Sequence, residues 1–199
     1  MGGLPSNVSS CLDAVNGQLY AGLIPPGLIG ITNQYPDAYQ YILDHLNPSG
    51  PYNKSAFLSA LTMDALTGDA FFAYQDIYKY FINGRSDIEA PIIQNILNFE
   101  GLMGYHGVPQ MPLFVYKAIA DELCPTVDTD ILVDRYCAVG ANILYERNTI
   151  GGHLAELYNG DGRAFEWLSS VLDGTYGSMY SATGCTIRNV TVGTDTSPI

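Results

Sequence analysis

A histidine and an aspartate, each placed after an apolar segment, are the residues best suited to acid–base chemistry. His153 follows the glycine pair at 151–152, and Asp121 follows an earlier apolar run. In open α/β sheets, the working side chains lie in loops just beyond the carboxyl ends of the strands. A carboxylate there can hold an imidazole in one tautomer and stabilise its cation, so that the imidazole acts as a general base. Asp121 and His153 are therefore the candidate catalytic dyad. The alternatives are a surface loop histidine and use of the adjacent Glu122.

The two apolar segments before these side chains are predicted to be strands. Residues 112–118 are an almost continuous apolar run, typical of a strand buried on both faces of a parallel sheet. Residues 141–146 predict a second strand. Helices are expected at about 126–138 and 163–172, each followed by a glycine that can cap its end. Because strand, loop and helix occur twice, residues 107–199 are expected to form a small parallel sheet with helices.

The first half of the chain has helical periodicity instead. Apolar residues recur at i, i+3, i+4 and i+7, which indicates helices that bury one face. These segments lie at about 39–46, 57–68, 74–81 and 92–97, while 23–31 could be a short helix or a mobile flap. Residues 1–106 are therefore expected to be a helical cap or lid region. Its aromatic residues are candidate walls of a substrate pocket, with ordinary helix packing as the alternative: Phe71, Phe72, Tyr74 and Tyr78.

Composition excludes several classes of function. Lys and Arg total 8 against 20 Asp and Glu, so the net charge is −12. Nucleic acids and anionic membranes are bound through Lys and Arg, so neither is an expected partner. A chain with 47% hydrophobic and 14% charged residues is not disordered, and it lacks the apolar run that a transmembrane segment needs. Its aromatic residues (15 Tyr, 7 Phe and 1 Trp) suit a hydrophobic small molecule or a lipid.

Metal and cofactor motifs are absent from the sequence. It has no Cys-x-x-Cys, no His-x-x-x-His and no glycine-rich phosphate loop, and its three histidines (His45, His106 and His153) are scattered. No metal and no cofactor are therefore expected.

Glycosylation sequons at Asn7, Asn53 and Asn189, with an even number of cysteines, are typical of secreted proteins. The first residues do not have the pattern of a signal peptide, so the localisation stays open.

From Met111 to about residue 174, the sequence resembles the C-terminal part of the fungal secretory lipases of the lipase A type. The resemblance rests on residues 112–116, 120–122, 140–143, 151–156 and 164–168, and it extends weakly back to 2–5. It implies an α/β-hydrolase fold with a helical cap over a deep acyl pocket, with Asp121 as the triad acid and His153 as the triad base. It also implies a disulfide between Cys137 and Cys185, worth roughly 3–4 kcal/mol in the chain-entropy model. The pairing of Cys11 and Cys124 stays open.

The sequence departs from this family at the nucleophile. Such a hydrolase needs a serine in a Gly-x-Ser-x-Gly elbow that precedes the acid and the base. No such motif occurs, because the segment at 84–88 lacks the second glycine. Ser6, Ser9 and Ser10 lie at a predicted helix start, where hydroxyls serve as caps. The expected fold class is therefore helix-rich α/β: a truncated α/β-hydrolase with a helical cap and a small residual parallel sheet.

Three hypotheses about function follow. The favoured one is a lipase-like enzyme without the serine nucleophile. It would use Asp121 and His153 for a cyclisation or isomerisation of a hydrophobic small molecule in fungal secondary metabolism. The second is the C-terminal portion of a carboxylic ester hydrolase or triacylglycerol lipase that needs a partner chain. The third is a lipid-binding pseudoenzyme. Two strands would leave apolar sheet surface uncovered, which predicts a homodimer.

Overall fold

The computed structural model describes residues 2 and 4–193, which fall into two compact units. Residues 7–102 form one, called here the helical unit. The described residues on either side of that range form the other, called here the sheet unit. The sequence predicts a helical cap or lid at residues 1–106 and a residual α/β-hydrolase region at 107–199. The roles of these two regions, as cap and as hydrolase part, stay predictions.

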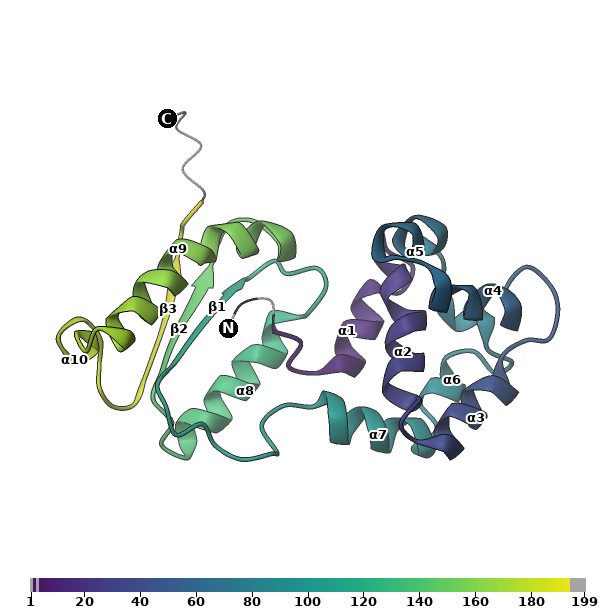
Figure 1. Cartoon of the computed structure of the whole chain (residues 1–199), viewed down its shortest axis with the longest axis horizontal. Coiled ribbons are helices and arrows are strands. Elements are labelled where there is room, and N and C mark those ends of the chain that lie inside the picture. The colour runs from purple at the N-terminus through teal and green to yellow at the C-terminus, as the bar shows by residue number, and fades with distance from the viewer. Residues whose placement is uncertain (1, 3, 194–199) are drawn as a thin grey trace. The chain divides into compact units, whose positions relative to one another are not determined.

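The sheet unit is built on a parallel sheet with the strand order β1 (Leu113–Ala118), β2 (Ile143–Asn148) and β3 (Cys185–Val190) (Figure 1). Helix α8 (Thr126–Ala138) connects β1 to β2, and α9 (His153–Leu172) with α10 (Tyr176–Met179) connects β2 to β3. Leu113 pairs with Ile143, which pairs with Cys185. Both connections therefore have the form expected between parallel strands.

Helices cover both faces of β1 and β2. Successive side chains of a strand point to opposite faces. Val115 of β1 packs in one cluster with Leu132 and Val133 of α8. Phe114 and Tyr116 lie in a second cluster, against which Trp167 of α9 packs. This two-sided burial explains why the segment at 112–118 is apolar at almost every position.

Helix α9 begins at His153, well before the helix expected at 163–172. Two glycines, Gly160 and Gly162, weakened the helical signal, because glycine is among the poorest helix formers. Gly160 is required by packing, since a Cβ there would lie 2.1 Å from the Tyr116 ring. A Cβ at Gly162 would meet open space. His153 is therefore the first residue of a helix and not a loop residue.

Strand β3 was not expected from the sequence. Its side chains are largely exposed and polar, as at Arg188 and Asn189, so it has no apolar run. Because β1 is covered by helices on both faces, the argument from an uncovered first strand no longer supports a homodimer. The dimer stays a prediction without that argument.

The helical unit packs short helices around an apolar core. Its elements are α1 (Val8–Val15), η1 (Ala21–Leu23), α2 (Ile24–Thr32), α3 (Pro36–His45), α4 (Lys54–Leu58), η2 (Ser59–Thr62), α5 (Ala65–Phe72), η3 (Ile77–Tyr80), α6 (Arg85–Ile88) and α7 (Pro91–Gly101). Its fully buried side chains include Ile24, Leu28, Ile42, Phe57, Phe72, Ile77 and Ile93. Among residues 2 and 4–193, every helix falls short of the length or apolarity that membrane crossing requires.

Two of the expected helices in this unit are shorter or interrupted. The helix expected at 57–68 is broken around Met63, between η2 and α5. The helix expected at 74–81 is only the 3₁₀ turn η3, because Tyr74 adopts a φ of 61°. That left-handed conformation does not belong to a right-handed helix, although the apolar spacing was helical. The segment at 23–31 is helical, in η1 and α2.

Candidate active site

Asp121 and His153 meet at one edge of the sheet. Asp121 lies in the loop after β1, and His153 opens α9 after β2. Because β1 and β2 are adjacent and parallel, their carboxyl ends bring these two residues to the same place. His153 Nδ1 lies 3.0 Å from each carboxylate oxygen of Asp121. The arrangement is an imidazole oriented by a carboxylate through Nδ1, which leaves Nε2 as the nitrogen for proton exchange.

Asp121 is held as a carboxylate by several donors. Its Oδ1 accepts hydrogen bonds from the backbone N–H groups of Leu123 and Cys124, at 3.0 and 2.8 Å. Lys117 Nζ lies 3.0 Å from Oδ2. Burial raises the pKa of Asp121, but the Cys124 N–H, the Lys117 ammonium and His153 together outweigh it and hold the pKa below its ordinary value. The group is therefore ionised at neutral pH and can stabilise an imidazolium.

Glu122 fixes the backbone of His153 and leaves the side-chain contact to Asp121. Its Oε2 accepts the His153 backbone N–H at 2.8 Å, where a carboxylate suits the N-terminus of α9. A Cβ on Gly152 would lie 2.3 Å from the same oxygen, so this close approach requires glycine. The His153 side chain is 21% exposed and that of Asp121 only 1%. The imidazole is thus reachable from solvent while its partner is enclosed.

A buried polar network holds the loop before His153. Asn148, at the end of β2, donates to Glu156 Oε2 at 2.6 Å and to the Val192 carbonyl oxygen at 2.7 Å. Arg163 bridges Glu156 and Glu146. Burial raises the pKa of Glu156, while Asn148 and Arg163 act against that rise. The network was not predicted, because its members are spread over β2, α9 and the segment after β3.

The family model described as secretory lipase matches residues 1–178. The chain belongs to the secretory lipase family. It is 45% identical over 191 residues to trichothecene C-3 esterase of Fusarium sporotrichioides, covering 96% of this chain and 42% of that protein. It is 30% identical over 180 residues to lipase A of Arthroderma benhamiae, covering 87% of this chain and 36% of that protein. The chain thus spans about two-fifths of the length of the curated relatives it matches.

A solved structure supports the fold. Candida antarctica lipase A in its closed state matches with a TM-score of 0.76 at 22% identity, covering 97% of this chain and 43% of that chain. The expected helix-rich α/β-hydrolase fold with a small parallel sheet, and the expected family, are confirmed.

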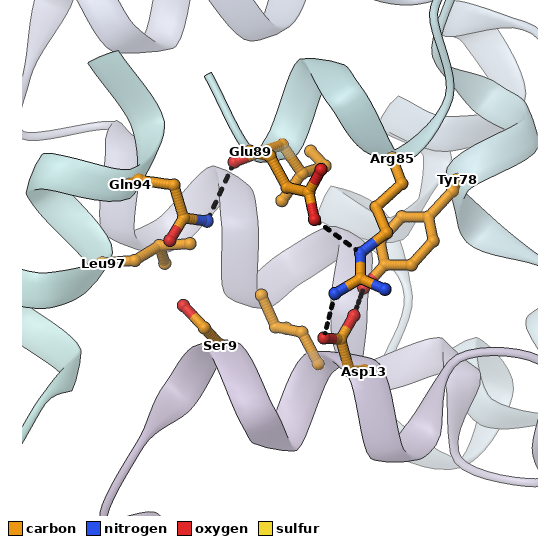
Figure 2. A pocket seen from close by; sticks show the side chains of 9 residues that line it. Ser9, Asp13, Tyr78, Arg85, Glu89, Gln94 and Leu97 are labelled. Carbon is orange, nitrogen blue, oxygen red and sulfur yellow. Dashed lines mark hydrogen bonds and ion pairs between the residues drawn. The ribbon is translucent and has the colours of Figure 1, made fainter. Parts of the chain in front are cut away.

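The four aromatic residues expected to line a pocket do not share one wall. Phe72 is fully buried and lies in the core with Tyr80, whose ring centroid is 5.8 Å away. Phe71 and Tyr74 are exposed. Tyr78 lines a separate pocket of about 100 Å³ within the helical unit (Figure 2). Phe71 and Phe72 end α5, whereas Tyr74, with its φ of 61°, and Tyr78 lie beyond that helix.

The pocket at Tyr78 is polar on its rim. Arg85 binds Asp13 at 2.7 Å and Glu89 at 3.0 Å, and the Tyr78 hydroxyl donates to Asp13 Oδ1 at 2.6 Å. Figure 2 shows Ser9 and Gln94 at the end of the pocket opposite Arg85 and Tyr78. The Ser9 hydroxyl is buried without a hydrogen-bond partner in the described part of the chain.

The other two serines at the start of the chain have structural contacts. The hydroxyls of Ser6 and Thr129 share a hydrogen bond of 2.9 Å, and Ser6 is buried. The Ser10 backbone N–H donates to Asn7, which is the N-cap of α1 in place of a serine. The Ser6 hydroxyl is therefore engaged by Thr129 within the sheet unit.

The sheet unit contains a disulfide between Cys137 and Cys185, the pair that the family resemblance implies. It joins the last turn of α8 to the first residue of β3, 48 residues later. Within residues 2 and 4–193, no group of three His, Cys, Asp or Glu side chains is arranged to hold a metal ion.

Proposed function

We propose that this chain carries the acid–base part of the active site of a carboxylic ester hydrolase. The observation that carries the proposal is the contact of His153 Nδ1 with the buried Asp121 carboxylate, 3.0 Å away. In this role, His153 Nε2 takes the proton of an attacking hydroxyl and later returns it to the leaving alcohol. Asp121 keeps the imidazole in the required tautomer and stabilises its cation.

The nucleophile of this reaction comes from outside the 199 residues. The sequence has no Gly-x-Ser-x-Gly elbow, and the Ser6 hydroxyl is engaged by Thr129. The proposal therefore requires a serine-bearing α/β-hydrolase segment, on the same polypeptide or on a partner chain, together with its oxyanion donors. Asp121 and His153 alone supply proton transfer, a factor of about 10²–10⁴ in general acid–base catalysis.

The substrate in this proposal is an ester with a hydrophobic part. One relative is named as a trichothecene esterase and others as lipases, which supports ester hydrolysis over the cyclisation or isomerisation that the sequence favoured. The helical unit is proposed as the cap or lid that binds the hydrophobic part. It exposes large apolar side chains on η1 and α5, two elements in contact with each other: Leu23, Leu66 and Phe71.

Reconstitution of hydrolysis tests this function. The chain is to be co-expressed with, or fused to, the part of the Fusarium esterase that it does not match, and turnover of p-nitrophenyl butyrate is measured. We expect hydrolysis only with both parts present, and a fall of at least about 10³-fold in His153→Ala. His106→Ala, at an exposed histidine, is the matched control and is expected to leave turnover unchanged. Undiminished hydrolysis in His153→Ala would overturn the proposal.

A further inference from the structure

Lys117 is a fully buried lysine beside the candidate dyad. Its side chain is 0% exposed, on a strand otherwise made of apolar residues. Its Nζ lies 3.0 Å from Asp121 Oδ2 and donates to the Leu4 carbonyl oxygen at 3.3 Å. Burying an ammonium group costs a large free energy unless it is paired and hydrogen-bonded. A lysine at this place therefore calls for an explanation beyond packing.

Two nitrogen groups share one carboxylate oxygen at this site. Asp121 Oδ2 lies 3.0 Å from Lys117 Nζ and 3.0 Å from His153 Nδ1. When His153 is neutral, the single negative charge of Asp121 balances the single positive charge of Lys117. When His153 gains a proton, two cations must share that one anion. The ammonium therefore opposes protonation of the imidazole that it does not touch.

Two further carboxylates lie near this site. Glu122 lies on the same loop as Asp121, and its exposed carboxylate accepts the His153 backbone N–H, which leaves its negative charge in place. Glu156 of α9 is buried, but it is bound to Arg163 and Asn148. The group facing Lys117 from the N-terminal segment is the neutral Leu4 carbonyl. Asp121 is thus the single carboxylate that Lys117 contacts among the described residues.

We infer that Lys117 is a positioning residue that neutralises the Asp121 carboxylate and so opposes protonation of the His153 imidazole. For its meaning in catalysis, the inference rests on the proposed function. Removal of the ammonium leaves the whole charge of Asp121 to the imidazole, because Lys117 and His153 compete for the same carboxylate oxygen.

An NMR titration of the isotope-labelled full chain tests this inference without any ester. The pH midpoint of the His153 imidazole signals is compared between the parent protein and Lys117→Met, a neutral side chain of similar size. We expect the midpoint to rise by about one pH unit or more, the effect of a unit charge removed from within a few ångströms at an effective dielectric constant near 20. Lys79→Met is the matched control, because Lys79 Nζ lies over the Tyr52 ring in the helical unit. A shift in Lys117→Met no larger than that in Lys79→Met would overturn the inference.

A second measurement needs no substitution and covers failure of Lys117→Met to fold. In the parent protein at neutral pH, the ¹⁵N signal of Lys117 Nζ is expected to be that of a charged ammonium in slow exchange with water. A neutral amine signal would contradict the inference. Loss of esterase activity in the reconstitution, with the titration shift present, would remove the proposed function and leave the electrostatic role intact. Ester hydrolysis by the reconstituted protein without the titration shift would support the proposed function and overturn the electrostatic role of Lys117.

Discussion

The Asp121 site of the sheet unit and the Asp13 pocket of the helical unit contain the same type of contact in different surroundings. Asp121 pairs with Lys117 at 3.0 Å, and both side chains are at most 1% exposed. Asp13 pairs with Arg85 at 2.7 Å, but these side chains are 41% and 56% exposed. An exposed pair contributes about 0–1 kcal/mol, whereas breaking a buried pair costs about 3–5 kcal/mol. Distance alone does not tell a functional contact from a surface contact.

The backbone around each aspartate explains the difference. Asp121 follows a strand end, and two loop N–H groups bind its Oδ1. Asp13 lies within helix α1 and is held by the side chains of Tyr78 and Arg85. Donors on a rigid backbone keep a carboxylate in position, while long exposed side chains lose entropy when they hold one. This difference favours Asp121 over Asp13 as the carboxylate of the proposed active site.

The largest expected effect separates the two aspartates by activity. In the reconstituted esterase, Asp121→Asn is expected to lower kcat by about 10⁴-fold, because an amide favours the wrong imidazole tautomer. Asp13→Asn is expected to change kcat by less than about twofold, since Asp13 contacts side chains of the rim only. Steady-state kinetics on a chromogenic ester measure both. Equal losses in the two variants would mean that the pocket also takes part in the reaction.

A smaller effect is expected at the glycine that lets α9 approach β1. Gly160→Ala places a methyl group 2.1 Å from the Tyr116 ring and is expected to destabilise the sheet unit by about 1–3 kcal/mol. Gly162→Ala, on the same helix with open space around it, is expected to stabilise the protein by about 0.4–1 kcal/mol. Urea denaturation followed by circular dichroism gives both values. The same sign for both variants would show that α9 is not packed as described.

The smallest expected effect tests the surface pair. Arg85→Ala is expected to lower the free energy of unfolding by less than about 1 kcal/mol, because Arg85, Asp13 and Glu89 are all partly exposed. The difference should shrink further in 1 M salt, where the Debye length is about 3 Å. Denaturation at low and high salt provides the comparison. A loss of several kcal/mol that persists at high salt would place this pocket in the same class as the Asp121 site.

Local patterns in the sequence were sufficient for the elements around the candidate dyad. Strands at 112–118 and 141–146 and a helix at 126–138 were predicted from apolar runs and a capping glycine, and the structure has β1, β2 and α8 there. The roles of Asp121 and His153 came from their place after these strands together with the family resemblance. An apolar run and a capping glycine involve residues close together in the chain, so a single sequence is enough to recognise them.

The features that the sequence did not predict depend on contacts between distant segments. Strand β3 is exposed and polar, so only its pairing with β2 identifies it. The early start of α9 depends on the contact of Gly160 with Tyr116. Lys117 lies in an apolar run, but its own type does not predict burial. It is buried with its ammonium group bound to the Asp121 carboxylate and the Leu4 carbonyl oxygen. The spacing of apolar residues along the chain does not predict contacts between segments far apart in the sequence.

The disulfide between Cys137 and Cys185 has a consequence for damage by proteases. The covalent ring that it closes contains β2, His153 and all of α9. A single cut anywhere between residues 138 and 184 therefore releases no fragment, because both new ends stay attached through the bridge. The histidine remains covalently joined to the part that carries the aspartate. A cut between residues 122 and 136 would instead leave the two halves of the dyad on separate polypeptides, held together by non-covalent packing such as that of β1 on β2 and α9.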